Sequence, residues 1–409
     1  MTASNKFNSL RYAASLAAIL AASSWVSPAA AQEKDITIGI LVPLTGELGE
    51  FGEIVANGVK LGVEQVNEAG GTKCGKLRTV VADTGGNPEV AIREATKMID
   101  TEHAVAILGP SSGEMVALAD LVKRKKVVLM SPYAGTITLN ELGGDYIYRT
   151  VSSDLGDGAA AGKWLSGRGY KRVAMLIQNE ESTISPAQVA RATIEKEGIE
   201  VTDYIVYNPG QPSYQAELVS VLNNAPDAIY LAGGQESGIT VLKEAAAGGF
   251  EGEWLLTADL AVPEVFSSVD PRILNDKAYV EIAEPDETLP EYVAFDKLVK
   301  EKTGEAPGPF AANSYDMAQL VSLGLEAGKD CTGEGINAVI RSITEEGEAV
   351  STFRDGKAAL AAGKDIDYQG ASGPLTMDKS GTPAGSYVIK KAVDGAWKNE
   401  AFYPASAFE

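Results

Sequence analysis

Histidine and cysteine are scarce in this chain of 409 residues, which contains one histidine and two cysteines. The histidine, His103, comes before the turn Gly109–Gly113, which matches the G-x-S-x-G pattern of a hydrolase nucleophile. A hydrolase of that kind needs a histidine after its serine, so this order argues against a Ser-His-Asp enzyme. The same scarcity argues against a zinc-type metal site. An all-oxygen calcium site stays open, although no EF-hand spacing is present.

Positive charge is also in short supply, because 35 lysines and arginines stand against 56 acidic residues and the formal net charge is −21. Such an acidic chain repels phosphate backbones, which argues against a nucleic-acid partner. Nucleotide-binding motifs are missing as well, since Gly46, Gly49 and Gly52 follow a G-x-x-G-x-x-G spacing rather than G-x-G-x-x-G. We therefore expect no cofactor.

The one long apolar run, Tyr12–Val26, lies close to the N-terminus. Lys6 and Arg11 precede it and an A-x-A site, Ala29–Ala31, follows it, which is the pattern of a cleaved secretory signal. A membrane anchor is the alternative, but a bilayer-spanning helix needs about 20 apolar residues. We predict that residues 1–31 are a signal peptide and that the protein is periplasmic. The remaining 378 of the 409 residues are enough for two domains.

The two cysteines, Cys74 and Cys331, would then lie in an oxidising compartment, where disulfides form and persist. A disulfide between them is our prediction. Two unrelated buried thiols are the alternative, because the sequence does not show whether the Cα atoms approach to bonding distance.

Strand-like and helix-like patterns alternate through most of the chain, and many helical stretches end at glycine. The predicted strands are Ile36–Leu44, Leu77–Asp83, Val105–Gly109, Val127–Ser131, Val173–Gln178, Glu200–Tyr207, Ala228–Ala232 and Trp254–Ala258. The predicted helices between them are Ile54–Glu68, Pro88–Glu102, Glu114–Arg124, Leu155–Ser166, Pro186–Glu197, Tyr214–Asn223 and Ser237–Ala246. This alternation predicts an α/β fold with parallel sheets that are covered by helices on both faces.

Two strand ends are candidates for a binding site. Ser111 or Ser112 would cap the helix that starts near Glu114, and the free N–H groups of that helix would suit a carboxylate. Asp259 follows a predicted strand, at the edge where open α/β sheets bind ligands, and could pair with an ammonium group. For both positions, helix capping alone is the alternative.

Several segments together resemble the periplasmic leucine/isoleucine/valine-binding protein family, the type I solute-binding proteins of ABC importers. They are Leu44–Gly46 before Phe51-Gly52, Gly109–Gly113, Ser131–Thr136 and Ser372–Leu375 through Asp378. The resemblance implies two doubly wound parallel-sheet lobes joined by three crossovers near residues 150–154, 280–285 and 366–372. Lobe one would comprise residues 33–152 and 283–368, and lobe two residues 153–282 and 369–409.

The resemblance also implies the roles of individual residues. In this family a serine after the third strand holds the ligand carboxylate, helped by a S-P-x-A-x-T segment, and an acid of lobe two holds the ammonium. The matching ligand-binding residues here are Ser112 with Ser111 beside it, Ala134, Gly135, Thr136, Asp259 and, in the side-chain pocket, Phe51.

This chain departs from the family pattern where tyrosines usually close the pocket on the side of lobe two. Residues Asn179–Pro186 contain no aromatic side chain, and Gln235-Glu236-Ser237 follows the Ala228–Gly234 segment. These polar replacements weigh against leucine, isoleucine and valine themselves. Glu236 either meets a basic or polar ligand or is solvated.

The predicted function is that of a monomeric, non-enzymatic receptor that captures an amino acid, branched-chain or related, by hinge closure. It would deliver this ligand to the permease of an ABC importer. The alternatives are an extracytoplasmic sensor of the same fold and a binder of a non-amino-acid carboxylate or amide.

Overall fold

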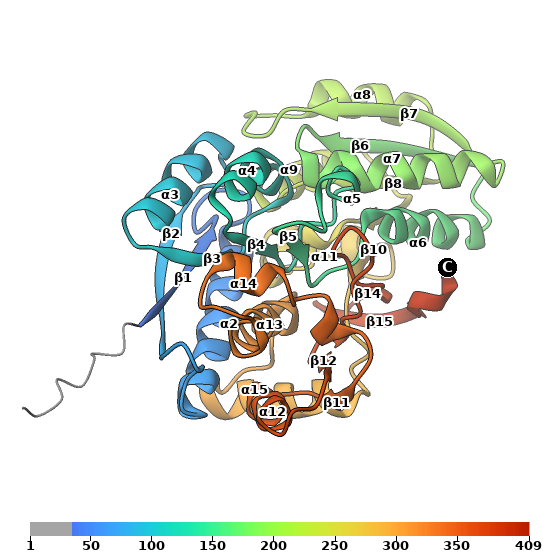
Figure 1. Cartoon of the computed structure of the whole chain (residues 1–409). Helices are drawn as coiled ribbons and strands as arrows, with labels where there is room; N and C mark the ends of the chain where they lie inside the picture. Colours follow the sequence, from blue (N-terminus) through green and yellow to red (C-terminus); the bar gives the residue numbers. More distant parts are fainter. Residues whose placement is uncertain (1–34, 409) are drawn as a thin grey trace, which may run out of the picture.

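The computed structural model describes residues 35–408, so the predicted signal peptide lies outside the described range (Figure 1). The strands are β1 (Ile36–Val42), β2 (Leu77–Asp83), β3 (Ala104–Leu108), β4 (Val128–Ser131), β5 (Ile147–Arg149), β6 (Arg172–Gln178), β7 (Glu200–Tyr207), β8 (Ala228–Ala232), β9 (Glu253–Leu256), β10 (Ala278–Ala283), β11 (Glu348–Val350), β12 (Ile366–Gly370), β13 (Gly373–Pro374), β14 (Tyr387–Val393) and β15 (Ala396–Tyr403). The helices are α2 (Gly49–Glu68), α3 (Pro88–Asp100), α4 (Ser112–Lys125), α5 (Leu139–Leu142), α6 (Asp154–Gly167), α7 (Glu181–Lys196), α8 (Gln215–Asn223), α9 (Gln235–Ala247), α10 (Pro263–Ser268), α11 (Pro271–Leu274), α12 (Pro290–Thr303), α13 (Ala311–Ala327), α14 (Gly333–Asn337) and α15 (Phe353–Ala361), with short 3-10 turns η1 (Ala258–Leu260), η2 (Ser342–Thr344) and η3 (Ala405–Ala407).

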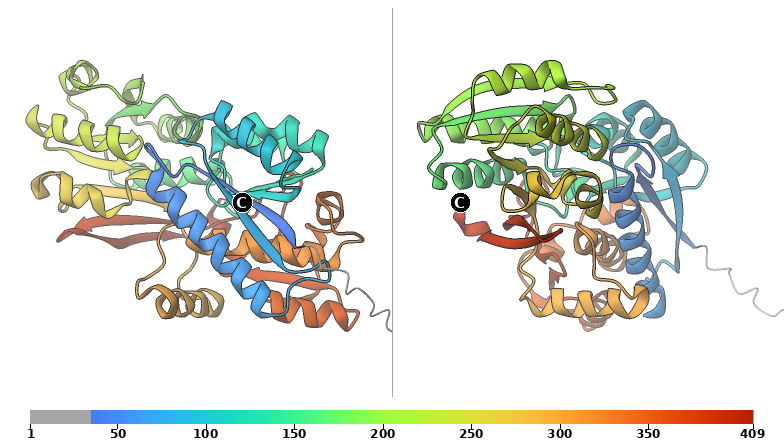
Figure 2. Two further views of the ribbon diagram at one scale, coloured as in Figure 1. Left: turned by 90° about the vertical axis from the view of Figure 1, so that its left-hand side faces the viewer. Right: turned by 180° about the vertical axis from the view of Figure 1, so that it is seen from behind.

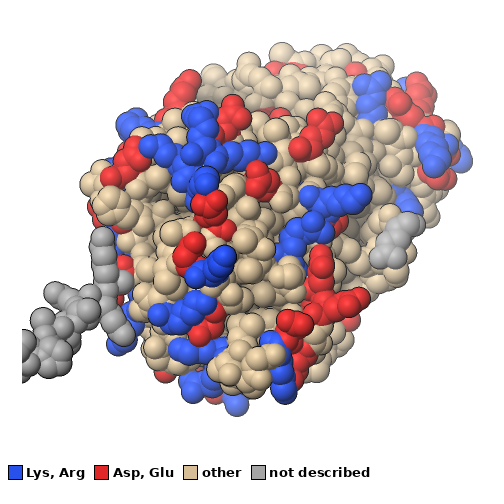
Figure 3. Space-filling view, viewed as in Figure 1, with Lys and Arg blue, Asp and Glu red and all other residues tan. Residues whose placement is uncertain are grey.

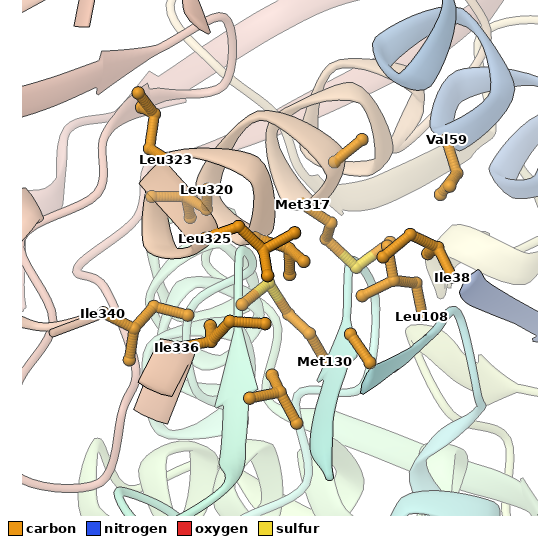
Figure 4. Packing of buried hydrophobic residues seen from close by; sticks show 14 of the residues in the cluster. Ile38, Val59, Leu108, Met130, Met317, Leu320, Leu323, Leu325, Ile336 and Ile340 are labelled. Atoms are coloured by element: carbon orange, nitrogen blue, oxygen red, sulfur yellow. The ribbon is translucent and has the colours of Figure 1, made fainter. Parts of the chain in front are cut away.

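The first sheet has five parallel strands in the order β2-β1-β3-β4-β5. Successive side chains of a strand point to opposite faces. Ile38 and Ile40 of β1 therefore pack with α2 and α13 on one face, while Leu41 packs with α3 and α4 on the other. Figure 4 shows Met317 of α13 beside Ile38 and Leu108 of this sheet, and three leucines of α13 belong to the same cluster. One covering helix thus comes from a distant part of the chain.

The second sheet has seven strands in the order β15-β14-β10-β9-β8-β6-β7. The strands from β10 to β7 run parallel, whereas β14 and β15 add to the β10 edge in antiparallel fashion. Leu176 and Leu256 pack with α8 and α9 on one face, and Met175 and Leu255 pack with α6 and α7 on the other. Both large sheets are doubly wound, which confirms the predicted fold class.

We call the five-stranded sheet with α2–α5, α12–α15 and the small sheet β11-β12-β13 body A. Body B is the seven-stranded sheet with α6–α11. Figure 2 (left) shows the two bodies side by side, with the dark red strands β14 and β15 in body B although the orange segments before them belong to body A.

The chain passes between the bodies three times, after β5, after β10 and after β13. The third passage is later than the predicted 366–372. The turn at Gly373 folds β13 back onto β12, and Leu375 and Met377 still belong to the core of body A. Sheet membership changes between Met377 and Tyr387. The residue boundaries of the two lobes as a whole stay a prediction.

The structure joins Cys74 to Cys331 in a disulfide, with a Cα–Cα distance of 5.6 Å, and so confirms the predicted pair. Cys74 lies in the turn that follows α2, and Cys331 lies just before α14. The bond therefore ties two parts of body A that are 257 residues apart in the chain.

Helix α7 begins at Glu181, five residues before the predicted start at Pro186. Proline is favoured in the first turn of a helix, which made Pro186 a reasonable first residue. Here Pro186 lies inside the helix, and because it has no N–H, the carbonyl of Ser182 lacks its regular intrahelical donor. The extra turn carries Glu181 and Ser182 toward body A.

None of the helices within residues 35–408 is long and apolar enough to cross a membrane. On the face drawn in Figure 3, acidic and basic side chains are interspersed in small groups.

Candidate functional site

A cavity of about 60 Å³ lies between bodies A and B. Ser112, Tyr133 and Gly135 line it from body A, and Thr257 and Asp259 line it from body B. The cavity is therefore bounded by the strand ends that the sequence marks as candidate sites, and it brings Ser112, Gly135 and Asp259 together.

The wall of body A begins at the turn between β3 and α4. Gly109 has φ +107°, and a Cβ atom there would lie 2.5 Å from a methyl group of Val42, so only glycine fits. The N–H of Ser111 donates to the carboxylate of Glu114 at 2.7 Å, and α4 begins at Ser112. The hydroxyl of Ser112 is buried and has no hydrogen-bond partner within residues 35–408. A free hydroxyl beside a helix N-terminus is suited to an anion.

The segment Ser131–Thr136 forms the adjacent wall. The hydroxyl of Ser131 donates to the carbonyl of Pro110 at 2.7 Å and accepts the N–H of Ala134 at 3.0 Å. Gly135 lines the cavity, whereas Ala134 and Thr136 are buried behind it. The structure thus places these predicted residues next to one another, although only Gly135 reaches the cavity surface.

Arg149, which the sequence analysis did not single out, holds this loop in place. Its buried guanidinium donates to the carbonyls of Gly135 at 2.8 Å and Thr136 at 3.1 Å. It also donates to the hydroxyl of Thr382 at 2.6 and 2.9 Å and to the side chain of Asn140. Burial lowers the pKa of Arg149 to about 10, so the group stays charged at neutral pH. Thr382 lies in the third passage, so one side chain links the loop to that connection.

Asp259 lies in the 3-10 turn η1 that follows β9, on the wall of body B. Burial raises the pKa of Asp259 to about 7, and the carboxylates of Glu180, Asp157 and Glu47 add to this shift. The hydroxyl of Thr257, two residues earlier, is buried and has no partner within the described chain. A carboxylate that loses solvation beside other acids is stabilised by a cationic ligand group.

Two further acids line the cavity from the first turn of α6. Asp154 and Asp157 are three residues apart and share one helix face. Oδ2 of Asp154, Oδ1 of Asp157 and Oε1 of Glu281, a buried β10 residue, accept no N–H or O–H donor from residues 35–408. Burial raises the pKa of all three carboxyl groups. The spacing Asp-x-x-Asp looked like an ordinary helix start in the sequence, so this cluster was missed.

The other predicted residues lie outside the cavity surface. Phe51 is buried and packs against Phe310, which does line the cavity, with 5.9 Å between ring centroids. The side chain of Glu236 is exposed and does not line the cavity.

Two carboxylates connect the bodies beside the cavity. Glu47, in the loop after β1, accepts the backbone N–H groups of Glu236 at 2.7 Å and Ser237 at 3.3 Å, in the first turn of α9. Burial raises the pKa of Glu47, and these hydrogen bonds oppose that rise. An acid of body A thus caps a helix of body B.

In the second connection the carboxylate belongs to body B and its hydrogen-bond donors belong to body A. Glu181 of α7 accepts the hydroxyl groups of Thr136 at 2.6 Å and Thr138 at 2.8 Å. The N–H of Ile137 donates to the hydroxyl of Ser185 at 3.0 Å. The structure is therefore held closed by one carboxylate from each body.

The pattern of the periplasmic binding protein family matches residues 35–395, which is most of the chain. This chain belongs to the periplasmic binding protein family. It is similar to the Leu/Ile/Val-binding protein BraC3 of Rhizobium johnstonii, with 25% identity over 378 residues, 88% of this chain and 94% of that protein. The chemotactic signal transduction system substrate-binding protein BasB of Halobacterium salinarum is 24% identical over 371 residues, 88% of this chain and 87% of that protein.

Solved structures share the fold of this periplasmic binding protein. The leucine binding protein LivK of Thermotoga maritima superposes with a TM-score of 0.78 at 22% identity, covering 90% of this chain and 99% of its own. A solute binding protein of an ABC transporter from R. palustris, in complex with benzoate, gives 0.76 at 18% identity and covers 90% and 96%. BraC3 is named as a Leu/Ile/Val-binding protein and LivK as a leucine binding protein, whereas the R. palustris protein of the same fold holds benzoate.

Proposed function

We propose that this periplasmic binding protein captures a small α-amino acid, branched-chain or related, between bodies A and B and delivers it to the permease of an ABC importer. The observation that carries the proposal is the opposition of two groups across one cavity. Ser112 presents a buried hydroxyl at a helix N-terminus that has no partner within residues 35–408, and Asp259 presents a carboxylate from the other body. A zwitterion has one charged end for each wall.

In this arrangement the ligand carboxylate would lie against Ser112, the first turn of α4 and the backbone of Gly135. Its ammonium group would pair with Asp259. Glu47 and Glu181 would then hold the bodies together around the ligand, and water would be excluded from both ion pairs. The amino-acid-binding names of relatives such as BraC3 support the same ligand class.

Isothermal titration of protein that has been unfolded, stripped of ligand and refolded tests the proposal. The titrants are the common amino acids, their decarboxylated amines and simple carboxylates. We expect an amino acid to bind and its decarboxylated amine to give no heat. Asp259→Ala should weaken binding of that amino acid by about 2–5 kcal/mol, because a buried ammonium would lose its partner.

The matched control is Glu197→Gln, which removes one carboxylate from an exposed site outside the cavity and should bind like the wild type. If Asp259→Ala binds the amino acid as tightly as the control, the ammonium assignment is wrong. If a carboxylate such as benzoate binds and no amino acid does, the ligand class is wrong.

Two relatives suggest alternatives. The benzoate-bound structure from R. palustris suggests an aromatic acid as an alternative ligand. Asp154, Asp157 and Asp259 would then surround a ligand without a positive charge. The similarity to BasB raises a sensor that reports ligand occupancy to a membrane receptor. Since the ligand site would be the same, capture of a permease or of a receptor from membranes by the ligand-loaded protein separates these two functions.

A further inference from the structure

The acids at the hinge end of the cavity exceed what the proposed zwitterion needs. Asp154 and Asp157 line the cavity next to Ser152, where the chain first passes between the bodies. They stand in addition to Asp259, which alone can pair with an α-ammonium. No lysine, arginine or histidine is among the described residues that line this cavity.

The surroundings of the pair compensate only part of its charge. Arg149 lowers the pKa of Asp154, although burial and the neighbouring Asp157 raise it more. Asp157 and Glu281 lie close to each other, and burial raises the pKa of both carboxyl groups. Asp157 thus lines the cavity with no basic side chain among the residues that line it, and Oδ1 of Asp157 accepts no donor within residues 35–408. The hydroxyl of Tyr230 beside them has no partner within the described chain.

Other buried polar atoms in the same cavity also have no hydrogen-bond partner among the described residues. The hydroxyl groups of Ser112 and Thr257 and Oδ2 of Asp154 belong to side chains that are at most 6% exposed, and none has a partner within residues 35–408. Buried polar atoms are almost always hydrogen-bonded in finished sites. Their number and position indicate a ligand that brings donors to both ends of the cavity.

Charge neutrality then selects the ligand. A zwitterion brings one positive and one negative charge. The helix N-terminus and the hydroxyl of Ser112 would stabilise the negative charge. The ammonium of the zwitterion pairs with Asp259 and leaves the carboxyl groups of Asp154 and Asp157 in the same cavity without a cationic partner among the residues that line it.

We propose that Asp157, backed by Glu281 and flanked by Asp154, forms a second cation subsite, and that the ligand is an amino acid with a positively charged side chain. The proposal rests on the amino-acid function given above and replaces its branched-chain side chain with a cationic one. It assigns specificity to residues at the start of α6, whereas the α-ammonium is assigned to Asp259.

Matched pairs of ligands test the subsite without any mutation. L-Ornithine and L-norvaline share one carbon chain, as do L-lysine and L-norleucine, and only the first of each pair has a side-chain ammonium. We expect the charged member of at least one pair to bind at least tenfold more tightly to the refolded wild-type protein. Neutral members that bind equally well or better would overturn the second subsite and leave the amino-acid function intact. Silence to every amino acid, with heat from benzoate, would overturn the proposed function as well.

Asp157→Asn assigns the effect to its residue, because it keeps the size of the side chain and removes its charge. We expect this variant to lose at least tenfold in affinity for the charged member while its affinity for the neutral member changes less than threefold. Glu197→Gln is the control for a lost surface charge and should change neither affinity. If Asp157→Asn preserves the preference for the charged ligand, the subsite does not depend on Asp157. Circular dichroism and thermal unfolding establish that the variants compared are folded.

Discussion

The connection from Glu47 to helix α9 offers a direct test of how the closed form is held. Glu47 belongs to body A, and its carboxylate accepts two backbone N–H groups in the first turn of a helix of body B. Replacing it by glutamine keeps an oxygen acceptor of similar length but removes the charge. Replacing it by alanine removes the contact altogether.

The geometry sets the size of the effect. One hydrogen bond is short, at 2.7 Å, and the other is long, at 3.3 Å, so the pair counts as little more than one good bond. A charged acceptor makes such a bond worth about 1 kcal/mol more than a neutral one, and the helix N-terminus adds about 0.3–1 kcal/mol. We expect Glu47→Gln to weaken ligand binding by about 1–2 kcal/mol, which is about 5- to 30-fold in dissociation constant. Glu47→Ala should cost at least as much.

Two assays separate this reasoning from a local structural effect. Titration with the amino acid that the protein binds gives the dissociation constant. Hydrogen exchange of the Glu236 and Ser237 amides should be faster in the variants, because exchange follows local opening of the contact. Glu181→Gln, which weakens the opposite connection, should add to the Glu47 effect since both act on one closing step. Wild-type affinity together with unchanged exchange in Glu47→Ala would refute the view that this carboxylate holds the bodies together.

Three further outcomes are expected. Arg149→Met should lower the free energy of unfolding by about 3–5 kcal/mol in urea denaturation, because buried carbonyls lose their charged donor; a loss below 1 kcal/mol would contradict this. Replacing Cys74 and Cys331 by alanine should cost about 2–5 kcal/mol in the same assay, and reductant should destabilise the wild type but leave the double variant unchanged. Since the pKa of Asp259 is about 7, its carboxylate takes up a proton as the pH falls through 7, so the affinity for an ammonium ligand should drop by up to about tenfold per pH unit below that point; an affinity that is constant from pH 8 to pH 5.5 would argue against this ion pair.

The alternation of strands and helices could be predicted from the sequence because apolar residues recur at different spacings in strands and in helices. Leu41 and Ile40 of β1 point to different helix layers, and both layers are apolar. The start of α7 was not readable, since Pro186 fits a first turn better than a helix interior. Positions that depend on tertiary contact were the hardest to predict.

Some residues of the candidate site could likewise be predicted from the sequence, and others could not. Ser112 and Asp259 follow strands directly, so their meeting at one cavity follows from the edge rule for parallel sheets. Arg149 gave no such signal, because its partners are backbone carbonyls and a residue 233 positions away. Asp157 and Glu281 come from a helix and a distant strand, and they become neighbours only in the folded structure.

The disulfide between Cys74 and Cys331 has a consequence for the order in which the chain acquires its structure. The strands of body B from β6 to β10 lie between the two cysteines, whereas α13, Cys331 and the last elements of body A come after these strands. Body A therefore cannot fold completely until its late segments are present, even though its first strands are synthesised earliest. The parallel part of body B can fold from one contiguous segment. Before residue 331 has been synthesised, Cys74 has no native partner, so its thiol must stay reduced until then. Native protein should therefore form in higher yield when oxidation follows synthesis of residue 331 than when oxidation precedes it.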